Sequence, residues 1–447
     1  MRDAPFFGRV CRAEAAVWRS DRQLRLTAGL VVLMGFVVIY QLGTPEAFMT
    51  AISADTLANI LFRLHWEEHG VRHEDSFYAQ NVNLWRDVFP AGLEKEFLGM
   101  EAGESRRVGL RPGAHVPVRD MRKVMTVPRK AFNVPAGQTE VEPLQGRFYP
   151  QGVLRGVPGV YPQNIQPFRV INMAEDTLTV DLNHPMADLE VTLEIDALAV
   201  WPKTAEFGGQ CRDWVCALTD GPGLKRRDRK GVDFGLDAPL DKPLGVNDAA
   251  FYATPRKVAH VDRQARENIG KVYERLLPGR KRILDLMAGW QSHLPDGVTA
   301  TGLGINAEEM SENSALSSHV VHDLNADPAL PFADRAFDAV ICSLSVEYLT
   351  RPLEVFREIA RVLEPGGLCV MVFSHRWFPD QAVRIWTELH EFERAGLVTE
   401  YFRQSGGFKE LSTLSVRGWP RPMDARDRYY PMIQHSDPVH AVWAVKP

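Results

Sequence analysis

Residues 282–376 constrain the fold of this chain most strongly, because short apolar runs alternate there with helical spacing. Residues 283–287, 337–342 and 368–373 are mainly apolar and of strand length, which is typical of strands buried on both faces. Ahead of the last run, apolar residues recur at helical spacing until Pro365-Gly366-Gly367, where we expect that helix to end. The alternation predicts an α/β fold, a parallel sheet wound with helices.

Polar residues follow the predicted strands at the positions where such sheets bind ligands. In parallel sheets the ligand lies at the carboxyl ends of the strands, near helix N-termini with free backbone N–H groups. We therefore expect ligand contacts from the residues after each strand. These residues are Asp285, Asn306, Asp323 and Ser343.

The run LPFADRAFDAVICSLSVEYLTRPLEVFREIARVLEPGGLCVMVFS resembles the second half of a class I S-adenosylmethionine-dependent methyltransferase domain. The most specific parts are PF-x4-FDAV and RVLEPGG, and the resemblance covers roughly residues 254–447. It implies a Rossmann-like fold, S-adenosyl-L-methionine as cofactor and methyltransferase activity.

The resemblance assigns the turn at residues 287–290 to the methionine part of the cofactor, which adds Met287 and Gly289 to the candidates. This turn reads MAGW, with one glycine where the family has several that let the backbone approach the cofactor. The second strand ends at Gly304, where the family has an acid for the ribose hydroxyls. Asp323 matches the acid that accepts from the adenine amino group. Affinity for the cofactor is therefore open at this stage.

Bulk composition indicates several globular domains. A chain of 447 residues predicts two or three domains, and 45% hydrophobic residues supply their cores. The net charge of -5 and the absence of a long Lys/Arg block argue against a nucleic-acid partner. Cys342 and Cys369 fall on predicted core strands. Cys211 and Cys216 pair if the compartment is oxidising, and free thiols are an equal alternative. The cysteine spacing predicts no metal site.

The N-terminal segment resembles a membrane anchor in its charge pattern. Residues 1–25 are basic, and residues 26–45 carry no charge. A bilayer crossing needs about 20 apolar residues. We expect a single-pass signal anchor with a cytoplasmic N-terminus; a cleaved signal peptide and a buried core helix are the alternatives. The arginine distribution places the soluble domains outside, whereas the supply of S-adenosylmethionine places them inside, so the topology is open.

The region from residue 50 to 200 is rich in predicted β-strands. Apolar and polar residues alternate in residues 60–66 and 189–196, as in half-buried antiparallel strands. Residues 89–100 predict a short amphipathic helix, and residues 107–110 predict a strand. This part is therefore expected to be an α+β domain.

Three segments of this region resemble the SlyD-type branch of FKBP peptidyl-prolyl isomerases and occur in the same order as in that branch. They are FPAGLEKEFLGMEAGES, VPRKAF and VDLNHPMADLEVTLEI. The resemblance implies an FKBP-like domain at residues 50–202 with an inserted flap at about residues 127–180. It also implies cis-trans isomerase or chaperone activity on proline-containing or unfolded polypeptides. The branch's histidine-rich tail is missing, which again predicts no metal.

Prolyl isomerisation has a barrier of about 18–20 kcal/mol, and an apolar pocket with one carboxylate lowers it. The family's pocket tyrosine has no clear counterpart, because the matching stretch is Ala114-His115-Val116-Pro117. The candidate residues for the isomerase pocket are Phe62, Glu74, Asp75, Phe89 and Leu93.

Residues 203–253 are rich in turn formers and predict a linker, after which residues 254–447 form the methyltransferase-like domain. A helix whose apolar face includes Ile269 and Val272 follows, and in the resembled fold such a helix covers the cofactor. Further on we expect an amphipathic helix over residues 382–392 and a closing strand at 441–445. The candidate substrate residues are Tyr252, Arg256, His260, Tyr348 and His375.

Two functions from different classes remain. The first is an enzyme, a membrane-anchored fusion of an FKBP-type isomerase or chaperone with a methyltransferase. The alternative is a non-catalytic FKBP-like chaperone or binding protein with a degenerate methyltransferase fold, which the turn at residues 287–290 and Gly304 favour. A third arrangement keeps the methyltransferase and omits the anchor.

Overall fold

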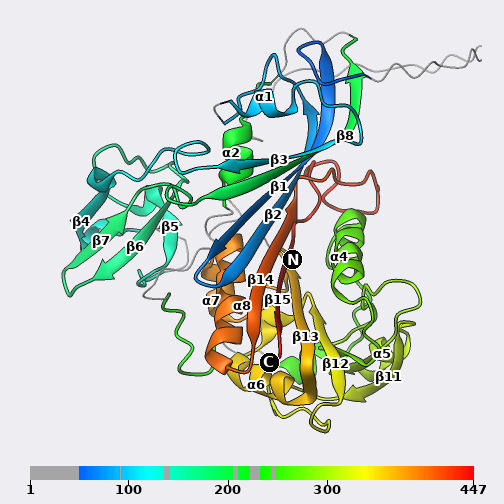
Figure 1. The fold of residues 1–447 in the computed structure, drawn as a ribbon. Helices are drawn as coiled ribbons and strands as arrows, with labels where there is room; N and C mark the ends of the chain where they lie inside the picture. The colour runs from blue at the N-terminus through cyan, green and yellow to red at the C-terminus, as the bar shows by residue number, and fades with distance from the viewer. Residues whose placement is uncertain (1–49, 91, 135–140, 205–209, 222–231, 244–246) are drawn as a thin grey trace, which may run out of the picture.

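The computed structural model describes residues 50–90, 92–134, 141–204, 210–221, 232–243 and 247–447 (Figure 1). The predicted basic segment 1–25 and the predicted anchor 26–45 lie outside these residues. Within the described ranges, every helix is too short or too polar to cross a bilayer.

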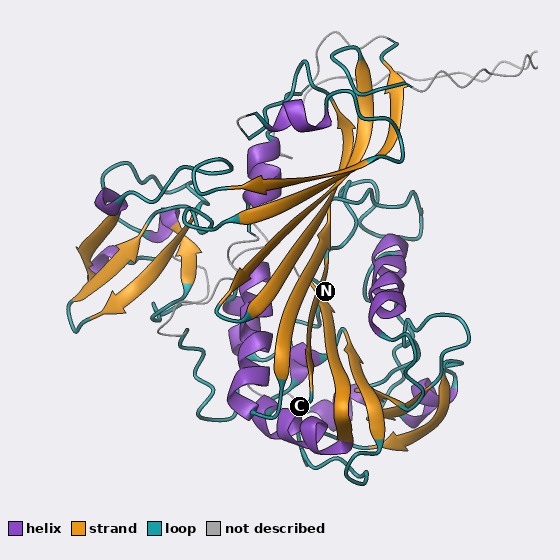
Figure 2. Cartoon of the chain, in the orientation of Figure 1, coloured by secondary structure: helices purple, strands orange, loops and turns teal. Residues whose placement is uncertain are grey.

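One large sheet runs through the molecule (Figure 2). It has eleven strands in the order β11-β10-β9-β12-β13-β15-β14-β2-β1-β8-β3. Neighbours among β11, β10, β9, β12 and β13 are parallel, and β15 is antiparallel to both β13 and β14. The predicted parallel sheet and Rossmann-like fold are therefore confirmed for the C-terminal region. Its strands are β9 (Ile283–Leu286), β10 (Ala300–Gly304), β11 (Leu316–Val321), β12 (Phe337–Ser343), β13 (Leu363–Ser374), β14 (Lys409–Arg417) and β15 (Val439–Val445).

Helices cover both faces of this half of the sheet. Leu284 and Val340 pack in the same core as residues of α6 and α8, whereas Ile283 and Ile341 pack with residues of α4. Successive strand residues point to opposite faces, so these strands are apolar throughout. The helices are α3 (Asp248–Tyr252), α4 (Arg263–Leu276), α5 (Ala307–Ser311), α6 (Pro352–Val362), α7 (Arg384–Glu388) and α8 (Glu391–Ser405), with the 3₁₀ turn η6 (Val346–Tyr348).

The N-terminal half contributes the remaining four strands and a separate small sheet. β1 alternates between buried and half-buried residues, as predicted from its sequence. The elements of this half outside the small sheet are β1 (Thr56–Glu68), β2 (Val71–Val82), β3 (Ser105–Leu110), β8 (Val191–Pro202), α1 (Leu93–Phe97) and α2 (Trp214–Thr219). The segment between β3 and β8 in the sequence forms the small sheet. It contains β4 (Val124–Pro128), β5 (Phe148–Pro150), β6 (Pro167–Met173) and β7 (Thr177–Asp181), with η2 (Met121–Lys123), η3 (Arg129–Ala131) and η4 (Gln151–Val153).

The two halves are joined by backbone pairing and by ion pairs, of which the one between Arg417 and Asp75 is largely buried. β2 pairs in parallel with β14, so an edge that would otherwise be open is covered. Beside this pairing, the Arg417 guanidinium lies 2.8 Å from Asp75, and Arg275 lies 2.8 Å from Glu74. The small sheet contacts α8 separately, because the Phe148 N–H donates to Glu393 over 2.9 Å. The sheet is thus continuous across both halves (Figure 1).

Three predicted helix boundaries are wrong, and local backbone geometry explains two of them. The helix predicted over residues 89–100 is limited to α1, because Gly92 is left-handed before it and Leu98 is extended after it. The helix predicted over residues 382–392 is two helices, α7 and α8. His390 begins the second with a capping box that Glu393 closes, so one helix cannot run through it. Helix α6 ends at Val362, ahead of the predicted proline-glycine stop.

Candidate cofactor site

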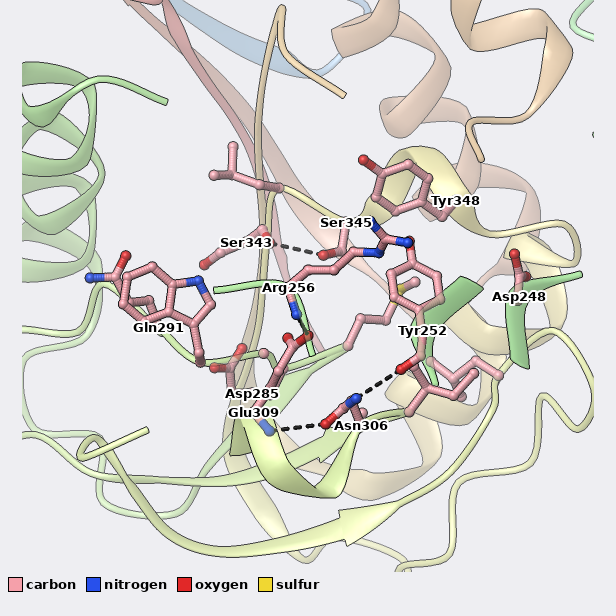
Figure 3. Close-up of a pocket in the computed structure, with 18 of the residues that line it drawn as sticks. Asp248, Tyr252, Arg256, Asp285, Gln291, Asn306, Glu309, Ser343, Ser345 and Tyr348 are labelled. Carbon is pink, nitrogen blue, oxygen red and sulfur yellow. Dashed lines mark hydrogen bonds between the residues drawn. The ribbon is translucent and has the colours of Figure 1, made fainter. Parts of the chain in front are cut away.

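A cavity lies at the carboxyl ends of β9, β10 and β12, and segment 248–260 forms part of its lining (Figure 3). It is lined by residues from separate parts of the chain because the parallel strands end at a common edge. The structure brings all six predicted cofactor residues to this cavity. They are Asp285, Met287, Gly289, Asn306, Asp323 and Ser343.

The turn after β9 keeps the shape of a glycine turn despite its side chains. Met287 has a φ of 56°, in the left-handed region that glycine adopts most easily. The Ala288 N–H donates to the Leu303 carbonyl over 2.8 Å, which holds the turn against β10. A Cβ on Gly304 would lie 2.2 Å from the Ala288 oxygen. Gly304 is therefore required by the close approach of these two segments.

Trp290, which follows the turn, forms part of the cavity wall. Its indole Nε1–H donates to the Val258 carbonyl over 3.2 Å. This bond ties the turn after β9 to the segment that precedes α4. The cavity persists beside the indole, so the bulky residue narrows the site without eliminating it.

Three of the predicted polar residues in the cavity differ in the hydrogen bonds that their side chains make. Asn306 caps α5 through its Oδ1, which accepts from the Glu309 N–H, and its Nδ2 donates to the Tyr252 carbonyl over 2.8 Å. Asp323 accepts from the backbone of Asn325 over 2.9 Å. Asp285 is almost fully buried, and burial raises its pKa to about 7, against a hydrogen bond from Ser292 that lowers it.

Four of the five predicted substrate residues also line the cavity, namely Tyr252, Arg256, His260 and Tyr348. The Arg256 guanidinium stacks 3.7 Å from the Phe251 ring centroid, and its backbone N–H donates to Glu309 over 2.6 Å. Burial lowers the pKa of His260. A neutral imidazole at pH 7 is able to accept a proton.

His375 is the predicted substrate residue that does not line the cavity. Its Nε2 lies 3.4 Å from Asp437 Oδ1, next to Arg376, which also contacts that carboxylate. Burial lowers the pKa of His375 to about 3. The residue after β13 is held by a loop near the C-terminus, which its position in the sequence does not reveal.

The sequence prediction missed several lining residues. Glu309 is one, although its place three residues after Asn306 fits an acidic residue in a first helical turn. Asp248 is another; Lys242 Nζ lies 2.7 Å from its carboxylate. Six separate segments line the cavity, so the residue spacing within one segment does not show which of its side chains face the cavity. Further missed residues are Gln291, His293, Asn325, Ser345 and Phe378.

The predicted isomerase residues lie partly in a packed core and partly at the junction between the two halves. Phe62 and Leu93 are buried, and Phe89 packs against the same core. The core is filled by Trp214 and Leu218 of α2, which come from the predicted linker. The Trp214 Nε1–H also donates to Asp87 over 2.8 Å.

The predicted isomerase carboxylates, Glu74 and Asp75, lie at the junction between the two halves. Their ion pairs with Arg275 and Arg417 commit them to holding β2 against the C-terminal half. Their assignment to an isomerase pocket is therefore not supported by the geometry. Arg275 and Arg417 lie 201 and 342 residues after Glu74 and Asp75 in the sequence.

Comparison with known proteins matches residues 288–371 to the Methyltransferase domain family. A short-type peptidyl-prolyl cis-trans isomerase of Methanocaldococcus jannaschii is 28% identical over 115 residues, which are 26% of this chain and 63% of that protein. A demethylmenaquinone methyltransferase of Renibacterium salmoninarum is 31% identical over 150 residues, 32% of this chain and 62% of that protein. The chain thus spans less than two thirds of these relatives.

Among solved structures, an S-adenosylmethionine-dependent methyltransferase of Thermotoga maritima, described as a possible histamine N-methyltransferase, is 14% identical. The match covers 41% of this chain and 90% of that chain, with a TM-score of 0.30.

The residues around the cavity fit S-adenosylmethionine. Gly289 lines the cavity without a side chain, and a Cβ there would lie 3.0 Å from Glu309 Oε2, so its backbone is accessible to a ligand. Asp285 supplies a carboxylate for a ligand that carries a sulfonium and an ammonium group. Residues 288–371 thus match a methyltransferase domain model, and the lining of the adjoining cavity is compatible with S-adenosylmethionine as the cofactor.

Proposed function

We propose that this protein transfers the methyl group of S-adenosylmethionine to an acceptor bound between segment 248–260 and the end of β12. The observation that carries the proposal is the convergence of all six predicted cofactor residues on one cavity. The match to the Methyltransferase domain family supports it.

The side chains present suit an in-line methyl transfer, which depends mainly on orientation. Asp285 and the turn after β9 would hold the cofactor, which supplies the methyl group when bound. Arg256, Tyr252 and Tyr348 would orient the acceptor from the other side of the cavity. His260, which lines the cavity, would take the proton that an acceptor hydroxyl or amine must lose.

Calorimetric titration of the chain with S-adenosylmethionine tests this function. We expect saturable binding, and we expect Gly304→Val to abolish it, because the added side chain would collide with the Ala288 carbonyl. Thr301→Val is the matched control, since Thr301 lies on the same strand and contacts Ser318 at the far edge. Absence of heat with the unmodified chain would remove the proposal.

We further propose that residues 50–202 are an FKBP-like module for proline-containing or unfolded polypeptides. The similarity to the archaeal short-type isomerase and the insertion of a four-stranded sheet between β3 and β8 support this. Because α2 fills the core beside Phe62 and Leu93, we propose binding without isomerisation in this state. A proline-limited refolding assay tests it, since catalysis would shorten the uncatalysed phase of tens of seconds or more.

We also propose that residues 26–45 anchor the chain in a membrane, with the N-terminus in the cytoplasm. The charge-free run and the arginines before it support the anchor. The cofactor is made inside cells, which favours a cytoplasmic position for the methyltransferase domain over the outside position that the arginines predict. A phosphatase or fluorescent reporter fused after Pro447 distinguishes the two sides.

A further inference from the structure

The end of β10 has no space for an acidic side chain. A Cβ on Gly304 would lie 2.2 Å from the Ala288 carbonyl oxygen and 3.1 Å from Met310 Sδ. Any carboxylate carried at this position would displace the turn after β9. The ribose of an adenosyl group offers two hydroxyl donors that nucleotide-binding sheets of this kind meet with a carboxylate. In this chain that carboxylate must come from another position.

Asn306, the next polar residue, is already committed to other bonds. Its Oδ1 accepts from the Glu309 N–H over 3.0 Å, and its Nδ2 donates to the Tyr252 carbonyl over 2.8 Å. These bonds start α5 and attach segment 248–260 to it. Asn306 therefore organises the backbone, with both Oδ1 and Nδ2 already in hydrogen bonds.

Two other carboxylates of the cavity are also engaged. Asp248 binds the Lys242 ammonium and the Asn325 amide, at 2.7 and 2.8 Å. Among the described residues, Asp323 accepts from the backbone N–H groups of Asn325 and Ala326 through Oδ1 alone, and its place after β11 is the one that the family resemblance assigns to the adenine amino group. Each is held by groups outside the turn that follows β9.

Glu309, on α5, has one carboxylate oxygen fixed and the other available. The side chain is 8% exposed, and its Oε1 accepts from the Arg256 N–H over 2.6 Å. Its Oε2 makes no hydrogen bond to another described residue and lies 3.0 Å from where a Cβ on Gly289 would stand. In Figure 3 Glu309 lies beside Asp285, with Tyr348 across the cavity. The free oxygen thus faces the turn that holds the cofactor.

We propose that Glu309 binds the ribose hydroxyls of S-adenosylmethionine through Oε2, one helical turn beyond the strand end that has no room for an acid. This rests on the proposed cofactor binding and names the residue that selects the adenosyl group. A carboxylate acceptor forms a stronger hydrogen bond than a neutral one. The Arg256 N–H fixes its orientation in advance, so little side-chain freedom is lost on binding.

The same carboxylate links the cofactor to the acceptor side of the cavity. Arg256 belongs to the segment that carries Tyr252 and His260, and its backbone is held by Glu309 Oε1. A ribose bound to Oε2 would therefore restrict the Glu309 side chain, which accepts the hydrogen bond from Arg256 of segment 248–260. We expect bound cofactor to reduce the hydrogen exchange of the Arg256 N–H.

The test uses S-adenosylhomocysteine and its 2′,3′-dideoxy derivative in calorimetric titrations of the full chain. Glu309→Gln is expected to weaken S-adenosylhomocysteine binding by roughly tenfold or more, as for loss of a charge-assisted hydrogen bond. The dideoxy derivative is expected to bind the variant and the unmodified chain equally. Glu309→Asp, which keeps the charge but withdraws it, should behave like Glu309→Gln.

The matched control is Glu308→Gln, the neighbouring residue of α5, which is exposed and lies 3.7 Å from Lys257. It should leave both affinities unchanged. Equal weakening of both ligands by Glu309→Gln would show a structural role and overturn the inference alone. An unmodified chain that binds neither ligand would overturn the proposed function as well. Thermal denaturation of each variant identifies those that fail to fold.

Discussion

The cavity at the end of β9 and the core beneath α1 differ in what fills them. Both lie where a family resemblance predicts a binding pocket. The first is open, and polar side chains from five segments line it together with Phe378 from a sixth. The second is packed by Trp214 and Leu218, which are 3% and 2% exposed. A family resemblance therefore predicts where a pocket belongs, whereas the rest of the chain determines whether it is empty.

The carboxylates of the two regions differ in the same way. Asp285 and Glu309 face the open cavity, each almost buried, with no described cation in an ion pair. Glu74 and Asp75 are bound by arginines of the other half. Asp285 and Glu309 therefore remain available to a ligand, while Glu74 and Asp75 stabilise the contact between the halves. The predictions below test this contrast.

The largest effect is expected from Trp214→Ala, which would empty the core beneath α1. Truncation of a buried tryptophan costs about 3–5 kcal/mol, and the cavity would lie beside Phe62 and Leu93. We expect lower stability in chemical denaturation and a gain of proline-peptide binding. Trp85→Ala is the control, because Trp85 is 66% exposed. A destabilised variant without new binding would mean that α2 is part of an ordinary core.

A somewhat smaller effect is expected from Asp75→Asn at the junction. The carboxylate is fully buried, and its removal leaves the Arg417 guanidinium, whose side chain is 13% exposed, without that partner. Loss of one partner of a buried pair costs roughly 3 kcal/mol. Denaturant titration followed by tryptophan fluorescence measures it.

Asp334→Asn is the matched control, because this carboxylate is 73% exposed and also pairs with an arginine, Arg361. Exposed pairs contribute about 0–1 kcal/mol. Equal effects of the two substitutions would contradict the view that Asp75 fastens the two halves together.

The pH dependence of stability tests a buried acid near the cavity, Glu347, rather than those at the junction between the halves. Burial raises the pKa of Glu347 to about 8. Its neutral form is favoured in the folded state, so this contribution is complete below the unfolded pKa and is lost as pH rises through about 8. We expect stability to fall between pH 5 and 8, and Glu347→Gln to flatten that decline in denaturation experiments.

The smallest effect is expected in cofactor binding near neutral pH. Because burial raises the pKa of Asp285 to about 7, its carboxylate ionises as pH rises through that value. The ionised form attracts the positive charges of S-adenosylmethionine, so affinity should increase from pH 6 to 8. Calorimetry with Asp285→Asn should show a flat profile, and an unchanged slope would assign the titration to another group.

The sequence by itself determined the parallel sheet and the edge at which the cofactor site lies. Apolar runs such as residues 337–342 need burial on both faces, and residues that follow parallel strands meet at one edge. Asn306 and Asp323, which follow β10 and β11, were predictable on that ground, and Asp285 and Ser343 lie within the last two residues of β9 and β12. Only these local rules, which act within a few residues, are readable without coordinates.

The tertiary structure decided which of the predicted groups stay available. Gly304 excludes a carboxylate because the turn after β9 packs against it, and Glu309 faces the cavity because Arg256 holds it. Trp214 fills the core beneath α1, and Arg417 takes Asp75. Each of these contacts joins residues distant in sequence. Their pairing depends on how whole elements dock, which no local pattern of residue types specifies.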